Sequence, residues 1–213
     1  MYIAYLESGD RIHISEYEDS MSGKIFCHEG HPLIAKRGDK VAHHFAHKSR
    51  TMCSAHDNVG EWHLWWQNRV FPDCIEISMK PHIADIKVIG YIIEIQHSPM
   101  KESVMRERES FYTKDHNLIW IFDCRNIEYR IESRSNNRIT LRWIRGPTFP
   151  LSGQYKGKVI KIFDFGKKEL LVVEAQQGKI ILGRALSLDD FDKIYIGSKL
   201  LPSAGRRIFH HSL

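Results

Sequence analysis

Two acids and an amide interrupt the aliphatic stretch "ADIKVIGYIIEIQHSP", residues 84–99, which otherwise has the composition of two β-strands. They are Asp85, Glu94 and Gln96. If residues 89 and 90 form a two-residue turn, Asp85 lies directly opposite Glu94, with their Cβ atoms roughly 5 Å apart. Gln96 shares the face of Glu94, because side chains in a strand alternate between faces. The pattern therefore predicts a hairpin with three polar groups on one face.

Two directly opposed acids repel each other, so this arrangement is expected where a positive group lies between them. A divalent cation is the simplest such group. Mg²⁺ takes one or two carboxylates and leaves positions open for water and phosphate oxygens. Ile93 and Ile95, on the other face, are expected to pack into the core. The alternative is that Asp85 and Glu94 belong to the solvent face of a half-exposed hairpin.

A second group of candidate ligands lies upstream, because seven of the thirteen histidines fall between residues 28 and 63. Cys27 and His31, followed after twelve residues by His44 and His47, have the spacing of a structural tetrahedral zinc site. A segment with so little apolar content often needs a metal to stabilise it. Other ligand choices are His28, His43, Cys53 and His56. The alternative is a set of ordinary histidines that pack on neighbouring phenylalanines.

Regular elements must position these groups. Helical spacing predicts a helix over about 58–70, followed by three strands. Ser98 as N-cap and a proline at the first helical position predict a second helix that ends near 114. The apolar run "LIWIFD", residues 118–123, is expected to be a buried strand. The order helix, three strands, helix, strand predicts an α/β (α+β) arrangement with a sheet covered by helices.

The last third of the chain is β-rich. Five segments separated by turn residues have the pattern of strands: "EYRIES", "RITLRWI", "KVIKIFDF", "ELLVVEA" and "KIILGRAL". Two prolines and two glycines in 146–153 favour a boundary there. We therefore expect a His/Cys-rich lobe over 1–57, a central domain over 58–145 and a β-rich C-terminal domain over 146–213.

Composition limits the class of protein. The chain has 213 residues, of which 42% are hydrophobic and 27% charged, so disorder and collagen-like structure are poor interpretations. Four widely spaced cysteines and the lack of a long apolar run predict an intracellular (cytoplasmic) protein without membrane spans. The net charge of +5 favours a polyanionic partner.

Several motifs in consistent order resemble the competence protein CoiA-like family, whose members are predicted nucleases of the PD-(D/E)XK superfamily. The motifs are "GDKVAHHFAHKSRTMC", "GEWH", "AD(I)…(I)IEIQHS", then Arg106, Arg108 and Tyr112, then "LIWIFD". The resemblance covers roughly residues 25–123. Gly30 stands where the CoiA-like pattern often has the second cysteine of a CxxC pair.

The resemblance implies an αβββαβ PD-(D/E)XK core that hydrolyses phosphodiester bonds with Mg²⁺ or Mn²⁺. The spacing of the cysteine and histidines predicts a zinc-ribbon-like lobe before this core. Asp85 and Glu94 match the motif acids, and Glu61 matches the helix acid that often completes the metal site. Gln96 takes the position that the superfamily usually gives to lysine, as is common in the CoiA-like group. Glutamine lacks the positive charge of lysine, but it can orient a water molecule. His63 is either a further site residue or a packing residue.

Three basic side chains are candidate DNA contacts: Arg106, Arg108 and Lys87. The alternative for the arginines is a solvated helix face with intrahelical ion pairs, and for Lys87 an ordinary surface position. Tyr112 is either a core residue with a polar tip or a substrate contact.

The expected function is that of a metal-dependent deoxyribonuclease acting on DNA, including recombination, branched or single-stranded intermediates, as a monomer or a homodimer. The alternatives are a catalytically silent DNA-binding protein of the same fold and a zinc-stapled protein interaction module.

Overall fold

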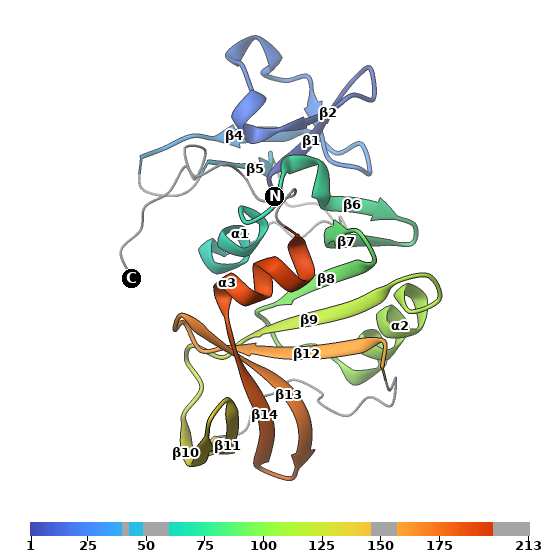
Figure 1. The fold of residues 1–213 in the computed structure, drawn as a ribbon. Coiled ribbons are helices and arrows are strands. Elements are labelled where there is room, and N and C mark those ends of the chain that lie inside the picture. Colours follow the sequence, from blue (N-terminus) through green and yellow to red (C-terminus); the bar gives the residue numbers. More distant parts are fainter. Residues whose placement is uncertain (40–42, 49–59, 146–156, 198–213) are drawn as a thin grey trace. The chain divides into compact units, whose positions relative to one another are not determined.

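The computed structural model describes residues 1–39, 43–48, 60–145 and 157–197, and the chain divides into two compact units (Figure 1). Met1–Ala84 belong to the first unit and the second begins at Asp85. This division differs from the predicted ones after residues 57 and 145. The predicted boundary segment 146–153 lies outside the described residues.

The first unit contains two small sheets and one α-helix. One sheet has the strand order β2-β1-β3, and β4 pairs with β5 in an antiparallel hairpin. The elements are β1 (Ile3–Leu6), β2 (Arg11–His13), β3 (Ile25–Phe26), β4 (Leu33–Lys36), β5 (His44–His47), α1 (Glu61–Gln67) and β6 (Ile75–Met79). Short 3-10 turns span Ile14–Glu16, Asp19–Met21 and Pro72–Cys74.

Helix α1 begins at Glu61 and ends at Gln67, so it is shorter than the predicted 58–70. The backbone of Gly60 is extended at its N-cap position. Pro72 sets a limit on how far the helix could continue, because a proline disfavours helical backbone in the residue before it. Trp62 and Trp66 are buried on one face of the helix.

The second unit is built around a mixed sheet in which the strands follow one another in the order β10-β11-β14-β13-β12-β9-β8-β7. Strands β8, β9 and β12 are parallel neighbours, and the other pairs are antiparallel. The strands are β7 (His82–Val88), β8 (Tyr91–Gln96), β9 (Asn117–Asp123), β10 (Tyr129–Ser135), β11 (Arg138–Trp143), β12 (Val159–Asp164), β13 (Glu169–Gln177) and β14 (Ile180–Ser187). The predicted α/β (α+β) class is confirmed at the level of a large mixed sheet with few helices.

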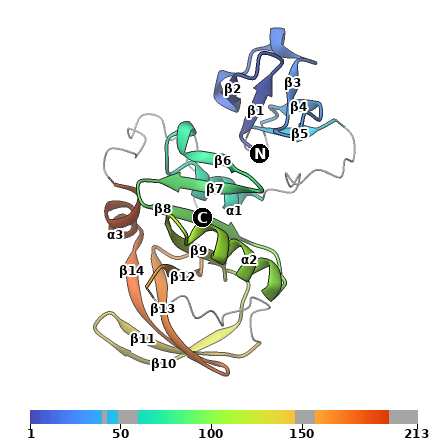
Figure 2. The ribbon, with the colours of Figure 1, turned by 90° about the vertical axis from the view of Figure 1, so that its right-hand side faces the viewer.

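Helix α2 (Glu102–Tyr112) lies against β8 and β9 (Figure 2). It begins after the predicted N-cap, Ser98, and Lys101 takes the N-cap position. Its buried side chains recur at helical spacing on one face: Met105, Glu109 and Tyr112. A short helix, α3 (Leu188–Phe191), follows β14 and continues as a π-helical turn, Asp192–Ile196. Within the described residues, no helix has both the length and the apolar character to cross a membrane.

The C-terminal strands belong to the same sheet as the central ones. Strand β12 pairs in parallel with β9 over six residues, from Val159 with Leu118 to Asp164 with Asp123. The region predicted as a separate domain from residue 146 therefore extends the sheet of the second unit. Strand β9 has hydrogen-bonded neighbours at both edges, and consecutive residues from Leu118 to Asp123 are buried, so both of its faces are covered, as is typical of parallel strands.

Candidate functional site

The hairpin of β7 and β8 has the predicted register. Ile86 pairs with Ile93, so the next residues along the two strands are Asp85 and Glu94. Gly90, in the turn, has φ +80°, a left-handed conformation that glycine adopts without steric cost. The two acids therefore come from adjacent strands, at the place that the index arithmetic predicts.

Asp85 also stabilises the hairpin. Its Oδ2 accepts a hydrogen bond of 2.7 Å from the backbone N–H of Ile95. The carboxylate is half-buried, and its hydrogen bond joins β7 to β8 beyond the last backbone pair, Ile86 with Ile93. Asp85 is therefore held in place by main-chain geometry.

Glu94 is buried, with 2% of its surface exposed, which excludes the solvent-face interpretation for this residue. Arg108 of α2 donates from Nη1 to Glu94 Oε2 at 2.5 Å. The pKa of Glu94 is raised to about 8, chiefly by burial and then by the negative charge of Asp85, against the opposing effect of Arg108. Tyr112, also on α2, lies close enough to affect the same carboxyl group. Burial and the charge of Asp85 therefore disfavour the ionised form of Glu94 more than Arg108 favours it.

The predicted DNA contacts separate into different environments. Arg108 faces Glu94, with 22% of its side chain exposed. Arg106 instead forms an exposed pair with Glu102, one turn earlier on the helix, with Nε at 2.9 Å from Oε1. Residues at i and i+2 of a helix lie on different faces, which explains the difference. Lys87 is half-buried on β7 and pairs in register with Ile92.

Of the other predicted catalytic residues, Gln96 belongs to the second unit and Glu61 to the first. Gln96 is half-buried at the end of β8, and its Nε2 donates to the carbonyl oxygen of Ser98. Glu61 is exposed at the first residue of α1 and His63 is half-buried on that helix, both in the first unit. The second unit by itself therefore supplies Asp85 and Glu94 as the acid pair.

The chain matches no protein-family model, no curated protein and no solved structure.

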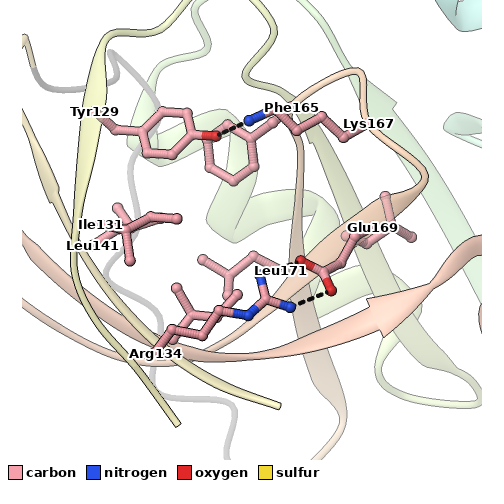
Figure 3. Close-up of a pocket in the computed structure, with 10 residues that line it drawn as sticks. Tyr129, Ile131, Arg134, Leu141, Phe165, Lys167, Glu169 and Leu171 are labelled. Atoms are coloured by element: carbon pink, nitrogen blue, oxygen red, sulfur yellow. Dashed lines mark hydrogen bonds and ion pairs between the residues drawn. The ribbon is translucent and has the colours of Figure 1, made fainter. Parts of the chain in front are cut away.

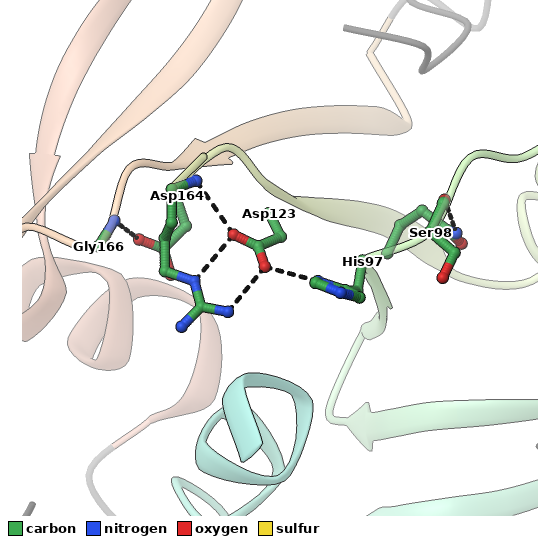
Figure 4. Close-up of polar contacts among 7 residues, drawn as sticks. His97, Ser98, Asp123, Asp164 and Gly166 are labelled. Carbon is green, nitrogen blue, oxygen red and sulfur yellow. Dashed lines mark hydrogen bonds and ion pairs between the residues drawn. The ribbon is translucent and has the colours of Figure 1, made fainter. Parts of the chain in front are cut away.

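A polar cluster that the sequence did not predict lies where the parallel strands end (Figure 4). Asp123, the last residue of β9, accepts hydrogen bonds from His97 Nδ1 at 2.6 Å and from Arg125 Nε and Nη2 at 2.9 and 2.8 Å. Its side chain is only 3% exposed, whereas that of His97 is 56% exposed. A buried carboxylate therefore orients an accessible imidazole, and the hydrogen bond at Nδ1 fixes the role of the other ring nitrogen.

A short repeat in the sequence could have indicated this cluster. Strands β9 and β12 both end in Ile-Phe-Asp, and the parallel register pairs the two segments residue by residue, with Asp123 opposite Asp164. Asp164 Oδ1 accepts from the backbone N–H of Gly166 at 2.8 Å, which fixes the turn after β12. The carboxyl ends of neighbouring parallel strands are common positions for ligand sites in such sheets. His97 was not predictable from the repeat, because it joins Asp123 only through the pairing of β8 with β9.

Replacing Asp123 with asparagine is expected to lower the free energy of unfolding by about 1–3 kcal/mol at pH 7, because charge-assisted hydrogen bonds are lost. Burial alone would raise the pKa of Asp123, but the hydrogen bonds from Arg125 and His97 outweigh it and hold the pKa below its usual value. The stabilisation is therefore present above the unfolded-state pKa and is lost as the pH falls through the folded-state pKa. Denaturant unfolding between pH 2 and pH 7 measures it. A loss that is equal at every pH, or equal to that of the exposed control Asp115→Asn, contradicts the expectation.

The first unit holds a cluster of three candidate metal ligands. Atoms of Cys27, His31 and His47 lie within 4.8 Å of one another, and Cys27 and His47 are buried. Cys27 Sγ is 3.4 Å from His31 Nδ1, close to the about 3.6 Å that separates sulfur and nitrogen ligands around a tetrahedral zinc ion. Gly30, with φ +83°, allows the tight turn between Cys27 and His31. The cluster could hold a metal ion, and its soft donors suit zinc.

His44 is the exception among the predicted zinc ligands. It is not part of the cluster, although it lies on β5 with His47. Side chains three residues apart in a strand point to opposite faces, and the burial of β5 alternates accordingly, with Phe45 and His47 buried. The alternatives Cys53 and His56 lie outside the described residues.

Proposed function

We propose that this protein is a metal-dependent DNA nuclease in which Asp85 and Glu94 hold Mg²⁺ or Mn²⁺. The observation that supports the proposal most directly is the raised pKa of Glu94 beside Asp85 in a rigid hairpin. Two carboxyl groups on adjacent strands, one of them buried, suit a hard divalent cation, which binds oxygen ligands and retains open positions. The resemblance to the CoiA-like family and its PD-(D/E)XK superfamily supports the same reaction class.

Each residue around the acids would have a separate role in hydrolysis. Asp85, held by the N–H of Ile95, would present its carboxylate to the ion in a fixed position. The ion, when bound, supplies an activated water and stabilises charge on the phosphate. Arg108 places a guanidinium group beside Glu94, and it would lend the site the positive charge that Gln96 lacks. Gln96, at the end of β8, would orient water or phosphate by hydrogen bonding.

A second candidate function is DNA binding without cleavage. The bond between Arg108 and Glu94 Oε2 favours it, because this ion pair already neutralises an acid that the metal would use. Binding would then depend on the basic surface, and its strength would fall steeply with salt. Salt-sensitive DNA binding that Asp85→Asn leaves unchanged, together with no cleavage, would identify this function.

The experiment that tests the proposal is a cleavage panel with the wild-type chain. Single-stranded, duplex and branched DNA are each incubated with Mg²⁺, with Mn²⁺ and with a chelator, and products are separated by length. The expected result is cleavage of at least one DNA form with either ion and none with the chelator. Failure to cut any form with either ion, by protein that still melts cooperatively, would refute the nuclease proposal.

A further inference from the structure

A small pocket lies far along the sheet from the hairpin acids, among β10, β11 and β13 (Figure 3). Its floor is aliphatic and includes Ile131, Leu141 and Leu171. Ile131 is 50% exposed, so the floor of the pocket is open to solvent there. The pocket therefore offers an accessible apolar surface within a well-ordered sheet.

Polar side chains close the pocket at two ends. Lys167 donates to the hydroxyl of Tyr129 at 3.1 Å at one end, and Arg134 pairs with both carboxylate oxygens of Glu169 at 2.9 and 2.7 Å at the other. A shift of register between Ile131 and Ser133 explains how Arg134 comes to line the same pocket as Ile131. The floor of the pocket is thus apolar, and among the described residues its rim carries one unneutralised cation, Lys167, besides the ion pair of Arg134 with Glu169.

An aromatic pair forms one wall. The rings of Tyr129 and Phe165 are 4.4 Å apart between centroids, with an interplanar angle of 44°. Lys167 Nζ lies 5.6 Å from the centroid of the Tyr129 ring. Trp143 is buried behind the pair, and the centroid of its ring lies 6.4 Å from that of Tyr129 and 6.0 Å from that of Phe165. The wall is therefore held rigidly from behind and offers aromatic surface to a ligand.

The segment that holds these strands has a large excess of positive charge. Between residues 129 and 187 the sequence has twelve lysines and arginines against four acids, a net charge of +8, whereas the whole chain has +5. Excess charge of this kind attracts phosphate backbones and is weakened by salt. A ligand that combines a flat aromatic group with negative charge therefore matches this pocket.

We propose that the pocket binds single-stranded nucleic acid, with one base against Tyr129 and Phe165 and the adjacent phosphate near Lys167. Stacking on aromatic side chains beside a basic surface is a general mode of single-strand binding, because every base has a flat face. A base in a duplex is already stacked and paired, so it is not available to such a wall. None of the lining residues belongs to the β7–β8 hairpin, so the inference is independent of hydrolysis at Asp85 and Glu94.

The test measures binding of a fluorescent oligothymidylate of about twelve nucleotides, a length suited to one site, by anisotropy in the presence of a chelator. Tyr129→Ala is expected to weaken binding by roughly 5- to 150-fold, the loss of one stacked base. Tyr129→Phe retains the ring and is expected to bind like the wild type. Lys167→Ala is expected to reduce the salt dependence of oligonucleotide binding by about one phosphate contact. Lys168→Ala serves as the charge control, because Lys168 is exposed, adjacent in sequence and outside the pocket.

Thermal melting of each variant separates loss of binding from loss of folding, and Lys167→Ala is at an exposed position that leaves the aromatic wall intact. Equal losses for Lys167→Ala and Lys168→Ala, or unchanged binding by folded Tyr129→Ala, would overturn the proposal. Binding of thymidine monophosphate or of a matched duplex as tightly as the single strand would also overturn it. Because the chelator prevents cleavage, these results do not depend on the nuclease proposal.

Discussion

Replacing Asp85 with asparagine is expected to reduce Mg²⁺- or Mn²⁺-dependent DNA cleavage by at least about 100-fold, because a metal ligand contributes several kcal/mol to the transition state. Asparagine keeps an oxygen that can accept the hydrogen bond from Ile95, so the hairpin is expected to stay folded. Glu94→Gln is expected to have the same effect on cleavage. It preserves the size of a side chain that is buried against Arg108.

The choice of amides follows from the geometry. Glu94→Ala would leave the Arg108 guanidinium without its carboxylate in a mostly buried position, and the loss of one partner of a buried pair costs about 3–5 kcal/mol. A loss of cleavage in that variant would therefore report unfolding as readily as chemistry. Glu128→Gln, at an exposed position of the same unit, is the matched control and should cleave like the wild type. Cleavage by Asp85→Asn at the wild-type rate would contradict the assignment of the metal to this acid pair.

Loss of metal from Cys27, His31 and His47 is expected to unfold the segment that contains them. Binding of structural zinc is worth about 10–16 kcal/mol in zinc-finger peptides, as much as the total stability of many domains. We expect pure protein to contain about one zinc ion for each chain, as structural sites do. A strong chelator should lower the melting temperature and make residues 25–48 susceptible to proteolysis.

The strand geometry provides an internal control for the zinc prediction. Cys27→Ser and His47→Gln should lower the zinc content of folded protein, whereas His44→Gln should retain it, because His44 lies on the other face of β5. Elemental analysis of the fraction that is folded by size exclusion measures this directly. Protein free of zinc that melts identically with and without chelator, or equal loss of zinc in the two histidine variants, would contradict the prediction.

The hairpin was predictable because a two-residue turn fixes every later pair of residues. Once the turn is placed at 89–90, the opposition of Asp85 and Glu94 follows from the count along each strand. The partner of Glu94 was not predictable in the same way. Arg108 reaches it only because α2 packs on β8, which is a tertiary contact between segments fourteen residues apart.

Periodicity bears on two pairs of predicted residues. Arg106 and Arg108 are two residues apart on a helix, so they lie on different faces of it. His44 and His47 are three residues apart in a strand, so they could not both face one zinc ion. The face on which each side chain lies follows from the sequence once the first pair is known to be in a helix and the second in a strand. The pairing of His97 with Asp123 needed more, because it depends on which strands are parallel neighbours.

The position of β9 between β8 and β12 bears on how this chain can be divided for expression. A shortened chain that ends at residue 145 would lack β12 and leave one edge of β9, the apolar "LIWIFD" strand, without its hydrogen-bonding partner. An uncovered edge of this kind recruits strands from other molecules. Such a fragment should form insoluble aggregates, while the chain that keeps β12 to β14 should not. Sequence boundaries chosen from the Pro/Gly-rich segment alone would thus remove a structural partner of the strand that ends in Asp123.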